Sequence, residues 1–106
     1  MKSQTQFRQG DVLITRVNTI PDGAKALKRE GDVILAHGEV TGHAHRIKER
    51  RAEMFDGGGG GMFLNLPVTS DLTHEEHSTI TIPAGGYRIT RQREYDDVQE
   101  WVQVAD

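Results

Sequence analysis

Short runs of alternating apolar and polar residues recur along the whole chain. The run "GDVLITRV", residues 10–17, alternates in this way and is rich in β-branched residues, which is typical of a half-buried strand. Similar runs follow, each bounded by Gly, Pro, Asn, Asp or Ser. We predict strands at residues 10–17, 32–37, 39–49, 51–55, 62–68, 71–77, 78–85, 87–95 and 100–106. No amphipathic pattern long enough for a packed helix occurs between them.

Two segments interrupt this pattern. Pro21-Asp22-Gly23 is typical of a turn, and residues 24–30 after it suit either one helical turn or a loop. The five glycines at 57–61 lack the Gly-Lys-Ser/Thr and helix of a phosphate-binding loop, and a predicted strand follows them. We therefore expect a flexible hairpin loop there.

Many short strands without helices predict an all-β fold, either a barrel or a sandwich. The 106 residues suit one domain, and neither an internal repeat nor a long linker divides them. We therefore expect a single β domain over residues 1–106. Edge strands of such a small domain favour pairing between two copies, so a homodimer is compatible with the pattern.

Charge and composition narrow the function. The formal net charge is −3, without the basic excess of most duplex-binding proteins, which argues against a nucleic-acid partner. No apolar run is long enough to span a membrane, and the polar N-terminus lacks a signal-peptide core, so we expect a cytoplasmic protein. The chain has no cysteine, which excludes disulfides and thiolate metal ligands.

The histidines are the main candidates for chemistry, since all five lie between residues 37 and 77. His43 and His45 are two residues apart, so a strand would point both to one face. Glu49 has the same parity and could add a carboxylate. His37, at a strand end before a glycine, is the weakest candidate.

The other two histidines, His74 and His77, have opposite parity, so one regular strand cannot direct both to one ion. A bulge or bend at Glu75–Glu76 would reconcile them. Imidazole and carboxylate ligands suit a divalent metal such as zinc, iron or manganese, with positions left open for water or substrate. The alternative is that the histidines are exposed strand residues that bind no metal.

A basic strand near the C-terminus is the second candidate. Tyr87, Ile89, Arg91 and Arg93 share one face of the predicted strand, and the first two are typical of a core. Arg91 and Arg93 could hold a small anionic ligand through forked hydrogen bonds. The alternatives are structural ion pairs with nearby glutamates, or a bulge near Thr90 that lets both arginines reach solvent.

Two family resemblances add to these patterns. The segment "GHAHRIKE" with the later "IPAGGY" resembles the two cupin motifs. That resemblance implies a cupin-like fold with His43, His45 and Glu49 as metal ligands. The second motif departs from the cupin pattern, because Arg88 stands where cupins carry a further histidine. His74 and His77 lie upstream instead.

The second resemblance covers nearly the whole chain. The blocks "QGDVLITRV", "GEVTGHAHRI" and "HEEHSTITIPAGGYRITRQREY" are similar to a family of small bacterial and phage proteins of unknown function. It implies a compact domain but no reaction. Two hypotheses follow: a metal-binding domain acting on a small anionic substrate, or a non-enzymatic binding module with surface histidines. The sequence leaves open whether the protein is an enzyme.

Overall fold

The computed structural model describes residues 5–29, 31–38 and 40–91. The chain forms β1 (Gln6–Gln9), β2 (Val12–Val17), β3 (Lys25–Ala26), β4 (Val33–His37), β5 (Ala44–Ile47), β6 (Glu53–Asp56), η1 (Gly58–Gly60), β7 (Met62–Leu66), β8 (Ser70–Thr73), β9 (Ile80–Ile82) and β10 (Gly85–Arg91). No α-helix occurs in these ranges, and the one helical element, η1, is a single 3-10 turn.

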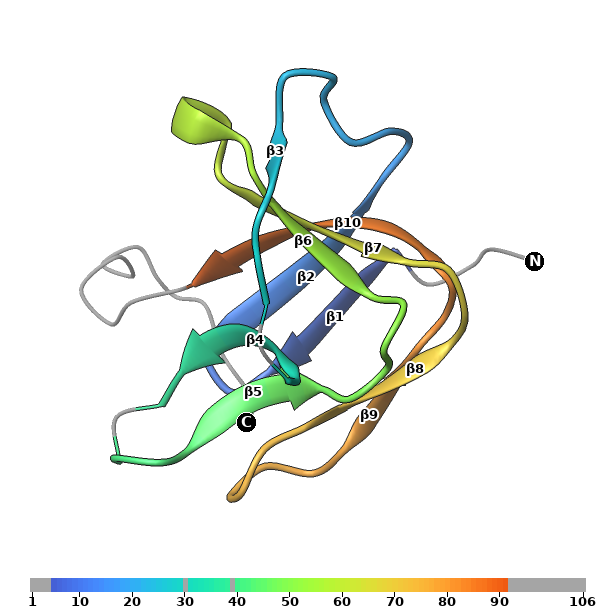
Figure 1. The fold of residues 1–106 in the computed structure, drawn as a ribbon. Helices are drawn as coiled ribbons and strands as arrows, with labels where there is room; N and C mark the ends of the chain where they lie inside the picture. Colours follow the sequence, from blue (N-terminus) through green and yellow to red (C-terminus); the bar gives the residue numbers. More distant parts are fainter. Residues whose placement is uncertain (1–4, 30, 39, 92–106) are drawn as a thin grey trace, which may run out of the picture.

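These strands form two antiparallel sheets (Figure 1). The larger sheet has the strand order β1-β2-β10-β7-β6-β3, and the smaller has the order β4-β5-β8-β9. Strand β10 lies between β2 and β7, so the end of the described chain is hydrogen-bonded into the middle of the larger sheet. The result is an all-β domain, as the strand pattern predicts, and of the two predicted architectures it is sandwich-like rather than a closed barrel.

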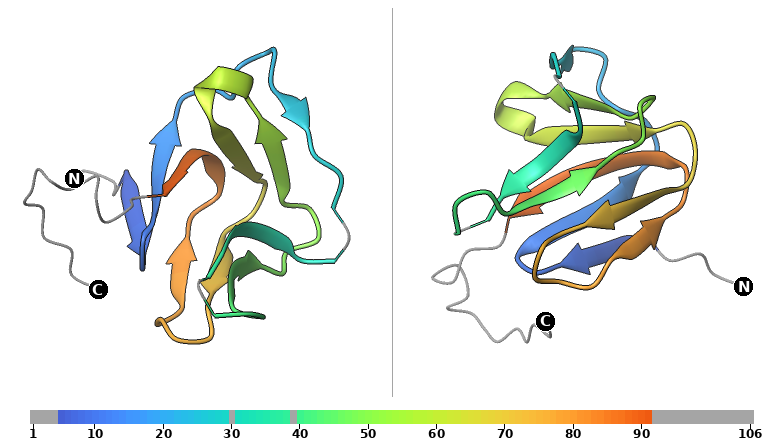
Figure 2. Two further views of the ribbon diagram at one scale, coloured as in Figure 1. Left: turned by 90° about the vertical axis from the view of Figure 1, so that its left-hand side faces the viewer. Right: turned by 60° about the horizontal axis from the view of Figure 1, so that its bottom comes forward.

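The two sheets form two layers (Figure 2). Their apolar faces share one core. Alternation supplies it: Ile14 and Tyr87 point inward from the larger sheet, and Ile47 and Leu72 from the smaller one, all of them inaccessible to solvent. Burying each such aliphatic side chain contributes about 1.5–3 kcal/mol. The predicted core positions Tyr87 and Ile89 are both buried.

Several boundaries differ from those predicted. The segment 24–30, expected to be a helical turn or a loop, contains the two-residue strand β3, which pairs with β6. Strand β8 ends at Thr73, so His74 and His77 lie in the β8–β9 loop and not on a strand. Strand β1 was not predicted, because its short polar sequence lacks the alternation of β-branched residues. The glycine run does connect β6 and β7 as a hairpin.

Candidate metal centre

The start of β5 positions the first two histidines. His45 shares its parity with Ile47, and both point into the core; His45 is 1% exposed. His43 precedes the strand, in the turn after β4, where its backbone carbonyl accepts a 2.8 Å hydrogen bond from the N–H of Gly38. The His43 side chain is half-buried, and its Nδ1 lies 2.9 Å from Oε2 of Glu76, outside hydrogen-bond geometry.

The β8–β9 loop brings the other two histidines to the same place. Residues 75–77 are bent, so His74 and His77 both lie against His45 despite their opposite parity. The ring centroids are 4.4 Å apart for His45 and His74, 4.6 Å for His74 and His77, and 5.8 Å for His45 and His77. The ring of His43 lies on the outer side of this group, 5.9 Å from that of His74.

A glutamate holds the β8–β9 loop against β5. Oε1 of Glu75 accepts a 2.9 Å hydrogen bond from the backbone N–H of Ala44, and its Oε2 lies 3.5 Å from the guanidinium of Arg46. The bond from Ala44 stabilises the carboxylate and lowers the pKa of Glu75. The loop is therefore tied to the strand that carries His45.

The end of β1 and the turn after it supply two polar partners that the sequence analysis missed, Gln9 and Asp11. Nδ1 of His45 lies 2.9 Å from Oε1 of Gln9, and its Nε2 lies 3.6 Å from Oδ1 of Asp11. Between them, Gly10 has a φ of 60°, and a side chain there would meet Nε2 of His77 at 2.5 Å. The inward parity of the polar Gln9 beside Phe7 was the available clue, but it requires β1 to be recognised.

Burial favours the neutral form of two of these imidazoles, those of His45 and His74. Desolvation, with the neighbouring His74 ring second, lowers the pKa of His45 to about 4. Desolvation also lowers the pKa of His74, with His77 as the next cause. Both rings are therefore unprotonated near pH 7, as a metal ligand must be.

Arg91 lies at the margin of the group. Its Nε donates a 2.8 Å hydrogen bond to Oδ2 of Asp11, and its Nη2 donates to the backbone carbonyl of His37. Arg91 thus forms an ion pair with an aspartate and not with one of the glutamates that the structural alternative named. The pairing also places a guanidinium beside the histidines. Arg93 lies outside the described residues.

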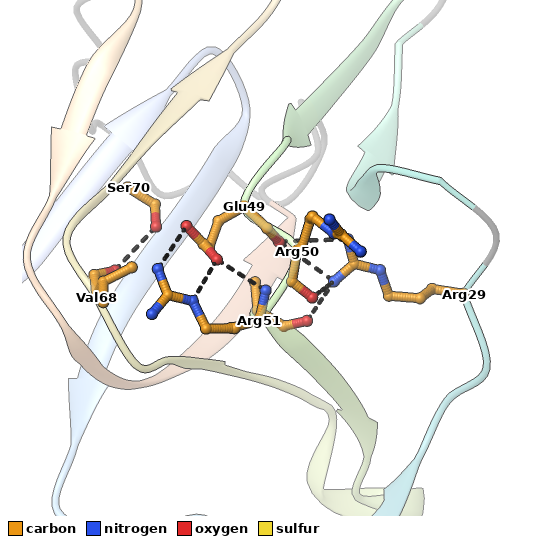
Figure 3. Close-up of polar contacts among 7 residues, drawn as sticks. Arg29, Glu49, Arg50, Arg51, Val68 and Ser70 are labelled. Atoms are coloured by element: carbon orange, nitrogen blue, oxygen red, sulfur yellow. Dashed lines mark hydrogen bonds and ion pairs between the residues drawn. The ribbon is translucent and has the colours of Figure 1, made fainter.

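Glu49 is engaged elsewhere, in the turn between β5 and β6 (Figure 3). Oε2 of Glu49 accepts hydrogen bonds from the backbone N–H of Arg51 at 2.8 Å and from its Nε at 2.9 Å. These bonds lower the pKa of Glu49. The structure thus departs from the expectation that Glu49 joins the histidines, because the chain leaves β5 at Ile47 and turns away.

The side chains do not form a finished coordination shell. Within residues 5–29, 31–38 and 40–91, no group of three or more His, Asp or Glu side chains has the arrangement of a metal site. One cause is visible at His74, whose Nδ1 accepts a 3.0 Å hydrogen bond from the backbone N–H of Glu76. The rings are in contact, but their nitrogens do not all face one point.

Comparison with known proteins places the chain in a family. A domain of unknown function, DUF8820, matches residues 8–92, and the chain belongs to this family. No curated protein and no solved structure matches the chain significantly, so the comparisons do not bear on the cupin resemblance. Among the residues that the structure describes, no helix is long and apolar enough to cross a membrane.

Proposed function

We propose that this domain binds one divalent metal ion through His45, His74 and His77, with Asp11 as the carboxylate ligand. The observation that carries the proposal is the contact of three imidazoles from two distant segments around the buried His45, beside a carboxylate from a third. His43, on the outer side and next to Glu76, flanks this set. Asp11 takes the role that the sequence pattern assigned to Glu49.

The chemistry of the donors supports the proposal. Imidazole and carboxylate ligands suit zinc, iron or manganese, and three histidines with one carboxylate are within the range of known sites. Two ligands bound to one zinc at about 2.0–2.2 Å and a tetrahedral angle lie about 3.4 Å apart. The separation of His45 Nε2 and Asp11 Oδ1 is 3.6 Å, close to that value.

Metal binding on this proposal requires a local adjustment of the β8–β9 loop. His74 must give up the hydrogen bond from the Glu76 N–H, or rotate, before its nitrogens can face the point between His45 and Asp11. Such a loop at the surface can adjust without disturbing the sheets, since Glu75 anchors its start to β5.

Arg91 suggests the class of further ligand. Its guanidinium bonds the outer oxygen of Asp11 and is partly exposed, with 36% of the side chain accessible. A small carboxylate or phosphate bound to an open position of the metal would lie beside this cation. The metal would polarise that ligand or lower the pKa of a bound water.

The rival hypothesis, a binding module with dispensable surface histidines, fits His37, which is exposed. It does not fit His45, which is 1% exposed and makes polar contacts with Gln9 at the end of β1 and with Asp11 in the turn after it. Burying a polar ring costs free energy unless it has polar partners, so a ring buried among such partners is not a dispensable surface residue.

The test is calorimetric titration of metal-free, full-length protein with zinc, manganese and iron(II). We expect near-stoichiometric binding of at least one metal, weakened by at least about 100-fold in a His45→Ala/His77→Ala variant. His37→Ala is the matched control, since it removes an exposed histidine, and should bind like the wild type. Circular dichroism and thermal melting check that each variant is folded. Absence of binding by the wild type, or wild-type affinity in the double variant, contradicts the proposal.

A further inference from the structure

Gln9 is a buried polar residue, only 3% exposed, on the inward face of β1. A buried amide needs hydrogen-bond partners, and Gln9 has three. Its Nε2 donates to the carbonyls of Leu72 and Ser78, each at 2.9 Å. Both amide hydrogens are thereby used.

These two carbonyls determine which way the amide faces. Carbonyl oxygens accept hydrogen bonds only, so the NH₂ group of Gln9 must point to Leu72 and Ser78 and cannot exchange places with its oxygen. Oε1 then faces Nδ1 of His45 at 2.9 Å. Because that oxygen also only accepts, Nδ1 of His45 must carry the hydrogen.

The tautomer of His45 follows. A neutral imidazole has one N–H, so a hydrogen on Nδ1 leaves a free lone pair on Nε2. That lone pair is on the side of the Asp11 carboxylate, 3.6 Å away. Two acceptors facing each other across this distance have a place between them for a cation. Without Gln9, the Asp11 carboxylate would instead attract the ring proton to Nε2.

We propose that Gln9 is the positioning residue of the metal site, which keeps Nε2 of His45 unprotonated and ties the β8–β9 loop to β1 through Ser78. This inference rests on the proposed function. Outer partners of this kind orient a ligating histidine and tune its affinity for metal, and their loss typically costs about 10–100-fold in affinity.

The test is long-range proton–nitrogen NMR of the histidine rings in metal-free, nitrogen-15-labelled protein, which reports the tautomer directly. We expect the wild type to carry the His45 hydrogen on Nδ1, and a Gln9→Met variant to carry it on Nε2. A Gln9→Glu variant keeps an acceptor for the Nδ1–H and should retain the wild-type tautomer. The zinc affinity of Gln9→Met should fall by about 10–100-fold.

Gln6→Met is the matched control, because it makes the same exchange at an exposed position of the same strand, and should leave both tautomer and affinity unchanged. If the wild-type protein carries the His45 hydrogen on Nε2, the inference is overturned whatever the variants show, even if zinc binds tightly. Wild-type tautomer and affinity in Gln9→Met also overturn it. The expected tautomers with no zinc binding by any protein overturn the proposed function, and the metal role of Gln9 with it.

Discussion

The two ends of β5 carry polar side chains of the same parity in opposite surroundings. His45 lies near the start of the strand, buried against other imidazoles, whereas Glu49 lies two residues beyond its end, in a turn with Arg51. The partners of His45 come from the end of β1, the turn after it and the β8–β9 loop, all more than 25 residues away in sequence. The partner of the Glu49 carboxylate is its near neighbour. Parity predicts which face a side chain occupies, but tertiary structure decides what meets it there.

The pKa values of His45 and Glu49 are both lowered, but for opposite reasons. Burial lowers the pKa of His45 because it disfavours the charged ring. Hydrogen bonds from Arg51 lower the pKa of Glu49 because they favour the charged carboxylate. The start of β5 therefore presents an unprotonated imidazole, whereas the turn after its end keeps an ion pair at the surface.

Neutralising the carboxylate beside His45 and, separately, the carboxylate of Glu49 should give the largest difference in metal affinity between the two ends of β5. We expect Asp11→Asn to weaken metal binding by at least about 100-fold, because it removes an anionic ligand beside His45. Glu49→Gln should leave the affinity unchanged, because that carboxylate bonds Arg51. Titration calorimetry measures both variants. Equal losses in the two would restore Glu49 as a ligand and contradict this account.

The pH dependence of the free energy of unfolding should reveal the burial of His45. The pKa of His45 falls from an ordinary value of 6.5 to about 4 on folding, so the unfolded chain binds more protons between these values. The free energy of unfolding of the metal-free protein should be constant with respect to this group above pH 6.5. It should then fall by up to about 3 kcal/mol as the pH drops to about 4.

Denaturant unfolding in a chelating buffer, across pH 7 to 4, measures this loss, and His45→Gln is the control. The lowered pKa of His74 acts in the same direction. The contribution of Glu49 has a different window, since it is lost only below the ordinary glutamate pKa of 4.5. Identical pH profiles for the wild type and His45→Gln above pH 4.5 would contradict the burial argument.

The turn after β5, which contains Glu49, should contribute to the free energy of unfolding but not to metal affinity. Arg29 donates to the backbone carbonyls of Glu49 and Arg50 (Figure 3), and also to those of Gly31 and Ala52, and so holds the turn after β5 in place. Arg29→Ala should reduce the free energy of unfolding by about 2 kcal/mol, since charged hydrogen bonds are lost. Zinc affinity should not change. A parallel loss of affinity would mean that the two ends are coupled.

Alanine substitutions at two glycines test how closely the turn after β1 contacts His77. Gly10 and Gly58 both have φ near 60°, so replacement by alanine strains either position by about 1 kcal/mol. A side chain at Gly10 meets His77, but one at Gly58 meets nothing within 4 Å. Gly10→Ala should therefore lose more stability than Gly58→Ala in thermal melting, and it alone should weaken metal binding. Equal effects would argue that His77 can move away freely.

The sequence was sufficient for the parts of this molecule that depend on local patterning. Alternation predicts the all-β fold and the core positions Tyr87 and Ile89. The concentration of histidines indicates which segments form the candidate site. The sequence was insufficient for Asp11 and Gln9, because the end of β1 meets β8 and the β8–β9 loop only in the folded structure. Parity makes Glu49 a possible further ligand, but the strand ends at Ile47 and a local ion pair takes the carboxylate.

The most direct measurement is a zinc-edge anomalous difference map from crystals of the zinc-loaded protein. The account predicts one strong peak within about 2.0–2.2 Å of His45 Nε2 and Asp11 Oδ1, with His74 and His77 turned toward it. A peak at the exposed His37 or at Glu49, or no peak at saturating zinc, would contradict it.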